Sequence, residues 1–126
     1  MVRENRIKDY TFSAFAVNGS EIAKTFSNHV LNGEILKIRA TNISSPGSFW
    51  VAESGTDIEI WRKNDFTSGL ASFEVYPFTY LNDSVNTTGS PQAFGMFVTS
   101  NILYIAGSGF TSGTSKTFGP VTVVYR

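Results

Sequence analysis

The stretch EILKIRATN at residues 34–42 alternates apolar and polar side chains along its whole length. Leu36, Ile38 and Ala40 share one face, and the lysine, arginine and threonine between and after them share the other. A period of two is typical of a β-strand with one buried face and one solvated face. The stretch therefore predicts an antiparallel strand, and it is the clearest strand in the chain.

Stretches rich in Ser, Thr, Asn and Gly separate short runs of strand-forming residues on both sides of this strand. Turns favour residues that tolerate positive φ or bond their own backbone, whereas strands favour β-branched and aromatic residues. We therefore expect an all-β fold, an antiparallel β-sandwich of about nine strands, of the jelly-roll or immunoglobulin-like type. The stretches lie at residues 43–48, 54–57, 81–92 and 107–120.

The turn residues also predict local pairings. We expect a break in pairing at Tyr76-Pro77, because proline cannot donate to a strand ladder. Residues 121–125 should form the closing strand, and Ile58 and Ile60 should face the core. Three hairpins are predicted: 10–17 with 21–26 across Asn18-Gly19, 49–53 with 58–62 across 54–57, and 93–98 with 102–106 across 99–101.

Length and composition favour one domain. The chain has 126 residues with 41% hydrophobic content, enough for a single two-layer core. We expect residues 10–126 to form one β-sandwich domain. The charged segment at residues 1–9 has few apolar side chains with which to dock, so we expect a mobile N-terminal arm.

Charge and cysteine content exclude several classes of function. Ten Lys and Arg residues balance ten Asp and Glu residues, so no basic stripe is available and nucleic acid is not an expected partner. Cysteine is absent, which excludes disulfides and thiolate chemistry. The N-terminus carries charges where a signal peptide needs an apolar region, and no segment resembles a membrane span. We therefore expect synthesis in the cytoplasm and no membrane partner.

The surface is expected to be poor in charge and rich in hydroxyl groups. Only 16% of the residues are charged, whereas a typical soluble domain has roughly 25%. Ser, Thr, Asn and Gly supply 48 of the 126 residues. Such a surface suits a protein that stands against a neighbour or works outside a cell, although the many turns of a β-domain explain it equally well.

Candidate catalytic residues are few. His29 is the only histidine, which excludes a multi-histidine metal site, and we expect it in a surface loop. Glu53, Asp57 and Glu59 lie around one predicted turn, where solvated turn charges explain them better than a glycosidase pair. The glycines at residues 107–109 precede no helix, which argues against a phosphate loop. We therefore expect no catalytic residues, no cofactor and no metal, and a protein that is not an enzyme.

Aromatic residues give a better indication of binding. Trp50 and Trp61 lie on the two arms of one predicted hairpin. If Ile58 and Ile60 face inward, Trp61 faces outward as a surface aromatic, available either to stack on a sugar or to cover part of a sheet. Phe110 and Phe118 lie in a Gly/Ser/Thr-rich segment, where we expect them to fill an interface between subunits.

About two thirds of the chain resembles small structural proteins of tailed phages. The similarity runs from Gly33 through Ser45-Pro46-Gly47-Ser48, Ile58-Glu59-Ile60 and Tyr76-Pro77. It continues through VTSNILYIAGSG at residues 98–109 and ends with GPVTVVYR at residues 119–126. The resemblance implies a non-enzymatic β-sandwich on the virion, such as a capsid-decoration or tail-associated protein. It supplies no ligand-binding residues.

These observations lead to one main hypothesis and two alternatives. We expect a virion structural protein whose partners are a capsid or tail protein and further copies of itself, with a trimer favoured because a closed interface hides exposed edges. One alternative is a carbohydrate- or surface-binding module that uses Trp50, Trp61 and nearby tyrosines. The other is a small hydrolase, which requires His29 or paired carboxylates in a cleft.

Overall fold

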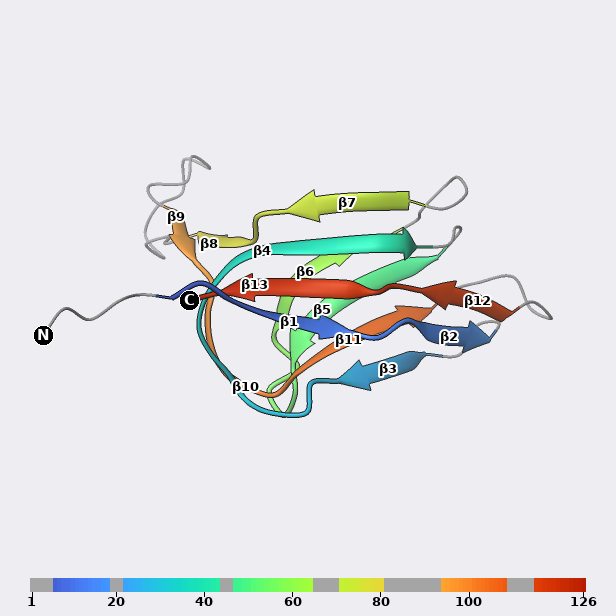
Figure 1. Cartoon of the computed structure of the whole chain (residues 1–126), viewed down its shortest axis with the longest axis horizontal. Coiled ribbons are helices and arrows are strands. Elements are labelled where there is room, and N and C mark those ends of the chain that lie inside the picture. The colour runs from blue at the N-terminus through green and yellow to red at the C-terminus, as the bar shows by residue number, and fades with distance from the viewer. Residues whose placement is uncertain (1–5, 19–21, 44–46, 65–70, 81–93, 109–114) are drawn as a thin grey trace, which may run out of the picture.

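The computed structural model describes residues 6–18, 22–43, 47–64, 71–80, 94–108 and 115–126. Every regular element in these ranges is a β-strand (Figure 1), so the predicted all-β class is confirmed. The described residues contain thirteen strands rather than the nine expected, and Pro77 separates two of them. The strands are β1 (Lys8–Phe12), β2 (Phe15–Asn18), β3 (Ala23–Phe26), β4 (Leu31–Ile43), β5 (Ser48–Glu53), β6 (Glu59–Lys63), β7 (Ala71–Val75), β8 (Phe78–Tyr80), β9 (Phe94–Met96), β10 (Val98–Asn101), β11 (Leu103–Ser108), β12 (Ser115–Phe118) and β13 (Val121–Tyr125).

The strands form two antiparallel sheets that face each other as a sandwich. The first sheet has the order β1-β13-β4-β10, with β7 also paired to β4. The second sheet has the order β3-β11-β5-β6. Two shorter pairs, β12-β2 and β8-β9, complete the described fold. The predicted closing strand is present as β13, and it lies inside the first sheet between β1 and β4 (Figure 1).

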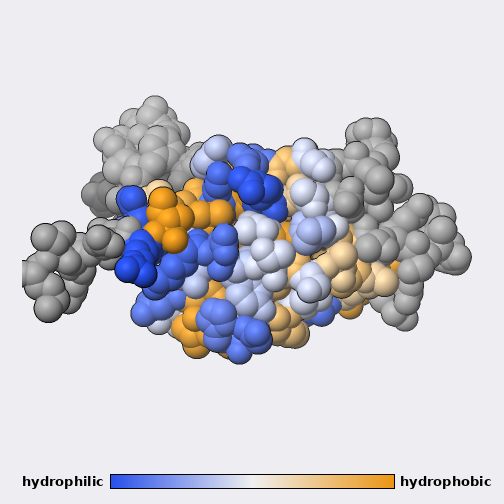
Figure 2. Space-filling view, viewed as in Figure 1, coloured by the Kyte–Doolittle hydropathy of each residue, from blue (hydrophilic) through white to orange (hydrophobic). Residues whose placement is uncertain are grey.

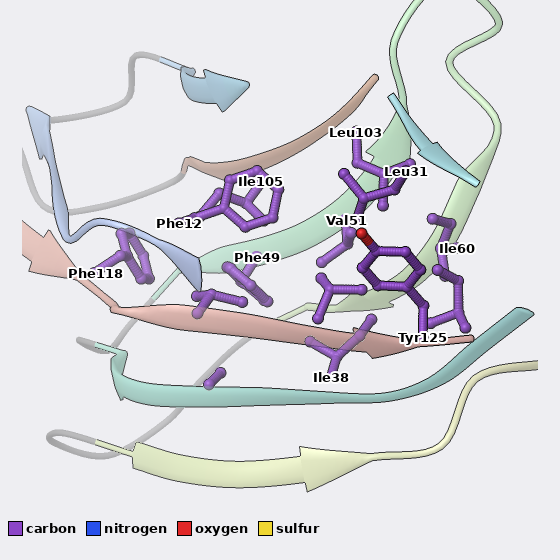
Figure 3. Close-up of a cluster of buried hydrophobic side chains, with 14 of the residues drawn as sticks. Phe12, Leu31, Ile38, Phe49, Val51, Ile60, Leu103, Ile105, Phe118 and Tyr125 are labelled. Atoms are coloured by element: carbon purple, nitrogen blue, oxygen red, sulfur yellow. The ribbon is translucent and has the colours of Figure 1, made fainter. Parts of the chain in front are cut away.

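One core fills the space between the sheets (Figure 3). Tyr125 of the first sheet and Ile60 of the second point into the same interior. Apolar side chains that alternate inward from two packed sheets are the ordinary way to bury such one-sided strands. The fully buried large side chains are Phe12, Val17, Leu31, Ile35, Ile38, Phe49, Val51, Leu103, Ile105, Phe118, Val121 and Val123.

The strand predicted at residues 34–42 is confirmed as part of β4. Ile38 and Ala40 are buried as the alternation requires, but so is Ile35, which is out of phase with them. The pairing with β13 shifts by one residue at Leu36, because Val124 lies opposite Lys37 whereas Tyr125 lies opposite Ile35. This bulge allows β4 to turn side chains from both phases into the core.

Gly33 marks the place where the end of the chain passes against β4. Its φ is 144°, and a Cβ atom there would overlap the carbonyl oxygen of Arg126. Next to it, Glu34 and Arg126 exchange two backbone hydrogen bonds of 2.7 and 3.0 Å. Both the backbone angle and the close approach therefore require glycine at this position.

The hairpin predicted across Asn18-Gly19 is wrong. β2 pairs with β12 and β3 pairs with β11, so the two strands belong to different sheets. The inward face also changes after Phe12, because Val17 is buried whereas Ala14 and Ala16 are exposed. The strands are interrupted here: β1 ends at Phe12 and β2 begins at Phe15, and Gly119, with φ 96°, approaches Ala14 closely. Beyond this interruption β2 presents the opposite phase to the core.

The hairpin predicted across residues 99–101 is also wrong. These residues lie in β10, which pairs with β4 in the first sheet, whereas the following β11 belongs to the second sheet. The chain crosses from one sheet to the other at Ile102. The predicted break at Tyr76-Pro77 is confirmed, since β7 ends at Val75 and β8 begins at Phe78.

The boundary of the N-terminal arm lies earlier than predicted. Lys8 and Asp9, which we assigned to the arm, pair with Tyr125 and Val124 in β1. A strand at this edge is held by backbone hydrogen bonds to β13, and these do not require apolar side chains. Within the predicted arm, residues 1–5 lie outside the described ranges.

Candidate binding surface

The outward side of the second sheet carries two rows of side chains that cross all four strands. Strand pairing places Lys24, Ala106, Trp50 and Arg62 side by side in one row. The neighbouring row contains Phe26, Tyr104, Ala52 and Glu59. We call these eight residues the aromatic face.

Each large ring in the middle of the aromatic face has an alanine beside it. Trp50 lies opposite Ala106, and Tyr104 lies opposite Ala52. These four residues form a buried hydrophobic cluster of their own, separate from the main core. Only 7% of Trp50 and 4% of Tyr104 are exposed, although both lie on an outer surface. The side chains at the sheet edges account for this low exposure.

Arg62 covers Trp50 from the β6 edge. Its guanidinium carbon lies 4.1 Å from the centre of the tryptophan ring, a favourable cation–π arrangement. Glu59 fixes the guanidinium with two hydrogen bonds of 2.6 and 2.8 Å. The hydrogen bond to Glu59 is also the main reason why the pKa of Arg62 is raised above its usual value. This edge of the aromatic face is therefore closed by an ion pair.

Lys24 covers Tyr104 from the β3 edge, with Nζ 4.6 Å from the ring centre. Within the described residues Lys24 has no ion-pair partner, so its long side chain is held there only by this contact. The Phe26 ring lies 5.5 Å from that of Tyr104 and is 51% exposed. The Tyr104 hydroxyl donates a 3.0 Å hydrogen bond to Asp57. Burial first, and this hydrogen bond second, raise the pKa of Tyr104.

The outward side of the first sheet is different in character. One of its rows contains Thr11, Thr122, Arg39 and Glu74. The two threonine hydroxyls lie 2.9 Å apart, and Arg39 donates to Glu74 at 2.7 Å. Figure 2 shows this side as mostly hydrophilic or neutral over β1, β13 and β4. The first sheet thus has the polar side chains expected of a solvated surface, whereas five of the eight residues of the aromatic face are aromatic or alanine.

The predicted position of Trp61 as a surface aromatic is wrong. The β5–β6 hairpin forms as expected, but its register shifts so that Val51 faces Trp61 while Ala52 faces Glu59. This bulge turns Trp61 inward, where its ring lies 5.2 Å from that of Phe73. Ile60 remains buried, and Ile58, which we expected in the core, is 51% exposed. Trp50, on the other arm, is the tryptophan on the outer side.

The prediction that Phe118 fills an interface between subunits is wrong, because the chain's own core buries this side chain. It lies in β12, is fully buried, and stacks on Phe15 and Phe49 with ring centres 5.5 and 6.1 Å apart. The Ser- and Thr-rich composition, which predicts a loop, also suits a strand, since threonine is β-branched. The residues around Phe118 show no alternation of apolar and polar side chains, so no local signal indicated its burial. Phe110 lies outside the described residues.

The candidate catalytic residues differ in their surroundings: Asp57 and Glu59 lie near Tyr104, whereas His29 and Glu53 have other partners. His29 is exposed, and its Nδ1 lies 2.6 Å from the side-chain oxygen of Asn28. Glu53 is buried, contrary to our expectation of a solvated turn charge, because Thr99 and Thr56 donate hydrogen bonds to it at 2.6 and 3.0 Å. Among the described residues, no group of three His, Asp or Glu side chains is placed to hold a metal ion.

A second feature is the apolar end of the sandwich, where β8, β9 and the C-terminus lie together (Figure 1). Four exposed hydrophobic side chains belong to segments that meet there: Ile7, Tyr76, Met96 and Val98. Strand pairing places two of them beside the C-terminus: Val98 lies opposite Glu34, which bonds to Arg126, and Ile7 precedes Lys8, which pairs with Tyr125. Hydrophobic residues also colour this end in Figure 2.

Comparison with known proteins adds no assignment to these two surfaces. No protein-family model matches the chain, and neither a curated protein nor a solved structure matches it significantly. No helix within the described residues has the length and apolar content needed to cross a membrane.

Proposed function

We propose that this chain is a non-enzymatic virion structural protein, a capsid-decoration or head or tail accessory component, that attaches through its apolar end. The observation that carries the proposal is that Ile7, Tyr76, Met96 and Val98, each 41–66% exposed, belong to segments that meet at one end of the sandwich. Contiguous exposed apolar side chains with a polar surround are typical of protein interfaces. The resemblance to tailed-phage structural proteins supports the same assignment.

The partner of the apolar end is a coat or tail protein of the particle. Arg126 at this end lies 3.6 Å from Glu34, and Lys8 lies over the Tyr125 ring with Nζ 5.9 Å from its centre. Charged side chains of both signs therefore border the exposed apolar side chains, as is usual at the rim of a protein interface. Both strands at the first sheet's centre, β4 and β13, run into this end and support it rigidly.

Substitution of Val98 by lysine tests this attachment. Val98 is 65% exposed, so Val98→Lys should leave the fold intact while placing a charge in the apolar contact. We expect at least tenfold weaker co-sedimentation with purified particles of the source virus, because a charge buried without a partner is costly. Ser72→Lys, at an exposed position of β7, is the matched control and should bind as the wild type does. Failure of the wild type to sediment with particles would overturn the proposal.

The proposal includes a closed homo-oligomer, with a trimer favoured. Light scattering at micromolar concentration should give three times the 13.8 kDa mass of the chain. Phe110→Ala should weaken association by about 1–3 kcal/mol if this ring fills a central pocket. A monomeric mass for the wild type would contradict the oligomer, whereas an unchanged mass for Phe110→Ala would contradict only that contact.

A further inference from the structure

We propose that the aromatic face binds a neutral saccharide, with Phe26 and Tyr104 as the stacking surface and Lys24 as a movable cover. This site is distinct from the apolar end, and it does not depend on the attachment proposed above. It would give the protein a second, ligand-binding role on the side of the sandwich formed by β3, β11, β5 and β6.

The stacking surface depends on how a sugar contacts an aromatic ring. A pyranose has an apolar side of C–H groups that packs on the flat surface of an aromatic ring, while its hydroxyls need polar partners at the rim. Phe26 already exposes half of its surface, and its ring lies 5.5 Å from that of Tyr104 at an angle of 52°. Tyr104 is only 4% exposed while Lys24 covers it, so displacement of Lys24 would complete a two-ring seat for one sugar unit.

The cover over Tyr104 can open. Lys24 is exposed and rests on the ring through a single cation–π contact of 4.6 Å, which is a weak interaction at a solvated site. Arg62 is different, because Glu59 holds it over Trp50 with two hydrogen bonds. A ligand would therefore displace Lys24 from Tyr104 and leave the Trp50 half of the aromatic face closed. After displacement, the ammonium remains within reach as a donor to sugar hydroxyls.

The charges around the seat select a neutral ligand. Two cations, Lys24 and Arg62, are balanced by two carboxylates, Asp57 and Glu59. A nucleic acid or an acidic glycan requires an excess of positive charge, which this rim lacks. A neutral polyol instead uses donors and acceptors together. Asp57 accepts one hydrogen bond from Tyr104 and retains acceptor capacity beside the seat.

The probes are a set of neutral oligosaccharides of glucose, galactose, mannose and N-acetylglucosamine, with uronic-acid and sulfated oligosaccharides as the charged comparison. Binding is followed by saturation-transfer NMR and by titration on the full chain. We expect at least one neutral family to bind at millimolar concentration or better, with weaker binding of its charged counterparts. Absence of neutral binding, or a preference for the charged set, would overturn the proposal.

Three variants locate the site. Phe26→Ala removes an exposed ring and should weaken binding at least tenfold. Asp57→Asn keeps the shape of the side chain and tolerates the φ of 56° at this position, and it should weaken binding severalfold by removing a charged acceptor. Val98→Lys, at the apolar end, should bind sugar as the wild type does. Equal binding by Phe26→Ala, or loss of binding by Val98→Lys, would show that the aromatic face is not the site.

Discussion

Phe118→Ala should lower the free energy of unfolding by about 3–5 kcal/mol, the range for truncating a fully buried phenylalanine. No part of Phe118 is exposed, and its ring stacks between those of Phe15 and Phe49. The side chain also fills the space above Gly107, where a Cβ atom would lie 2.6 Å from the phenylalanine ring. Truncation leaves a cavity in the core. We expect the cavity to persist, because the strands around it are held in place by their pairing.

Urea denaturation followed by tryptophan fluorescence measures this loss, because Trp61 packs against the same core. Phe26→Ala makes the same chemical change at an exposed position and should cost much less. Gly107→Ala tests the same contact, because the added methyl group would press on the Phe118 ring. It should destabilise the wild type by about 1–3 kcal/mol and the Phe118→Leu variant, which lacks the ring, by less. Unchanged unfolding of Phe118→Ala would contradict the core position of this residue.

Glu53→Ala should destabilise the protein by about 3 kcal/mol at neutral pH, because it removes a buried, charge-assisted hydrogen-bond network. Glu53 is 6% exposed and lies at the end of β5. Thr99 of β10 donates to it at 2.6 Å, and Thr56 of the adjoining turn donates at 3.0 Å. Without the carboxylate, the Thr99 hydroxyl would lose its partner while remaining buried.

The contribution of Glu53 should depend on pH with a defined sign. Burial raises its pKa, but hydrogen bonds from Thr99, Thr56 and Asn101 outweigh burial and lower the pKa below the ordinary value. A pKa that is lower in the folded state means that the folded protein binds the proton less readily than the unfolded chain. The stabilisation is therefore complete above the usual glutamate pKa of about 4.3 and is lost as the pH falls through the folded-state value.

Denaturation of the wild type and of Glu53→Gln between pH 7 and pH 3 isolates the contribution of the ionised Glu53 side chain to the stability of the protein. The difference in stability between the two should shrink as the pH falls, because the wild-type carboxylate becomes protonated and the glutamine does not titrate. Glu59→Gln, at an exposed carboxylate bonded to Arg62, is the matched control and should give only a small difference in stability at neutral pH. A difference for Glu53→Gln that stays constant across the range would contradict the assigned role.

Local features of the fold were predictable from the sequence because they depend on residues close together in the chain. The alternation at residues 34–42 identified β4, the turn at 54–57 identified the β5–β6 hairpin, and Pro77 identified the break between β7 and β8. The all-β class followed in the same way. Each of these depends on side-chain period, on turn chemistry or on the missing amide of proline, all of which are local properties.

The aromatic face was only partly predictable. Tryptophan at residues 50 and 61 indicated a binding surface near one hairpin, and that hairpin does contribute to it. A single bulge decided which indole faces outward, because a shift of one residue exchanges the two sides of a strand. Tyr104, Lys24 and Phe26 joined Trp50 only through the pairing of β11 with β3 and β5, which no local pattern indicates.

The sequence by itself determined the class of fold, the positions of most strands and the neutral, charge-poor surface. The tertiary structure alone decided which strands pair and which side of each strand is buried. Phe118 shows the reason most clearly: its burial depends on pairing with Phe15, more than a hundred residues earlier in the chain. Pairings over such distances arise from the packing of the whole core, and composition around one residue cannot reveal them.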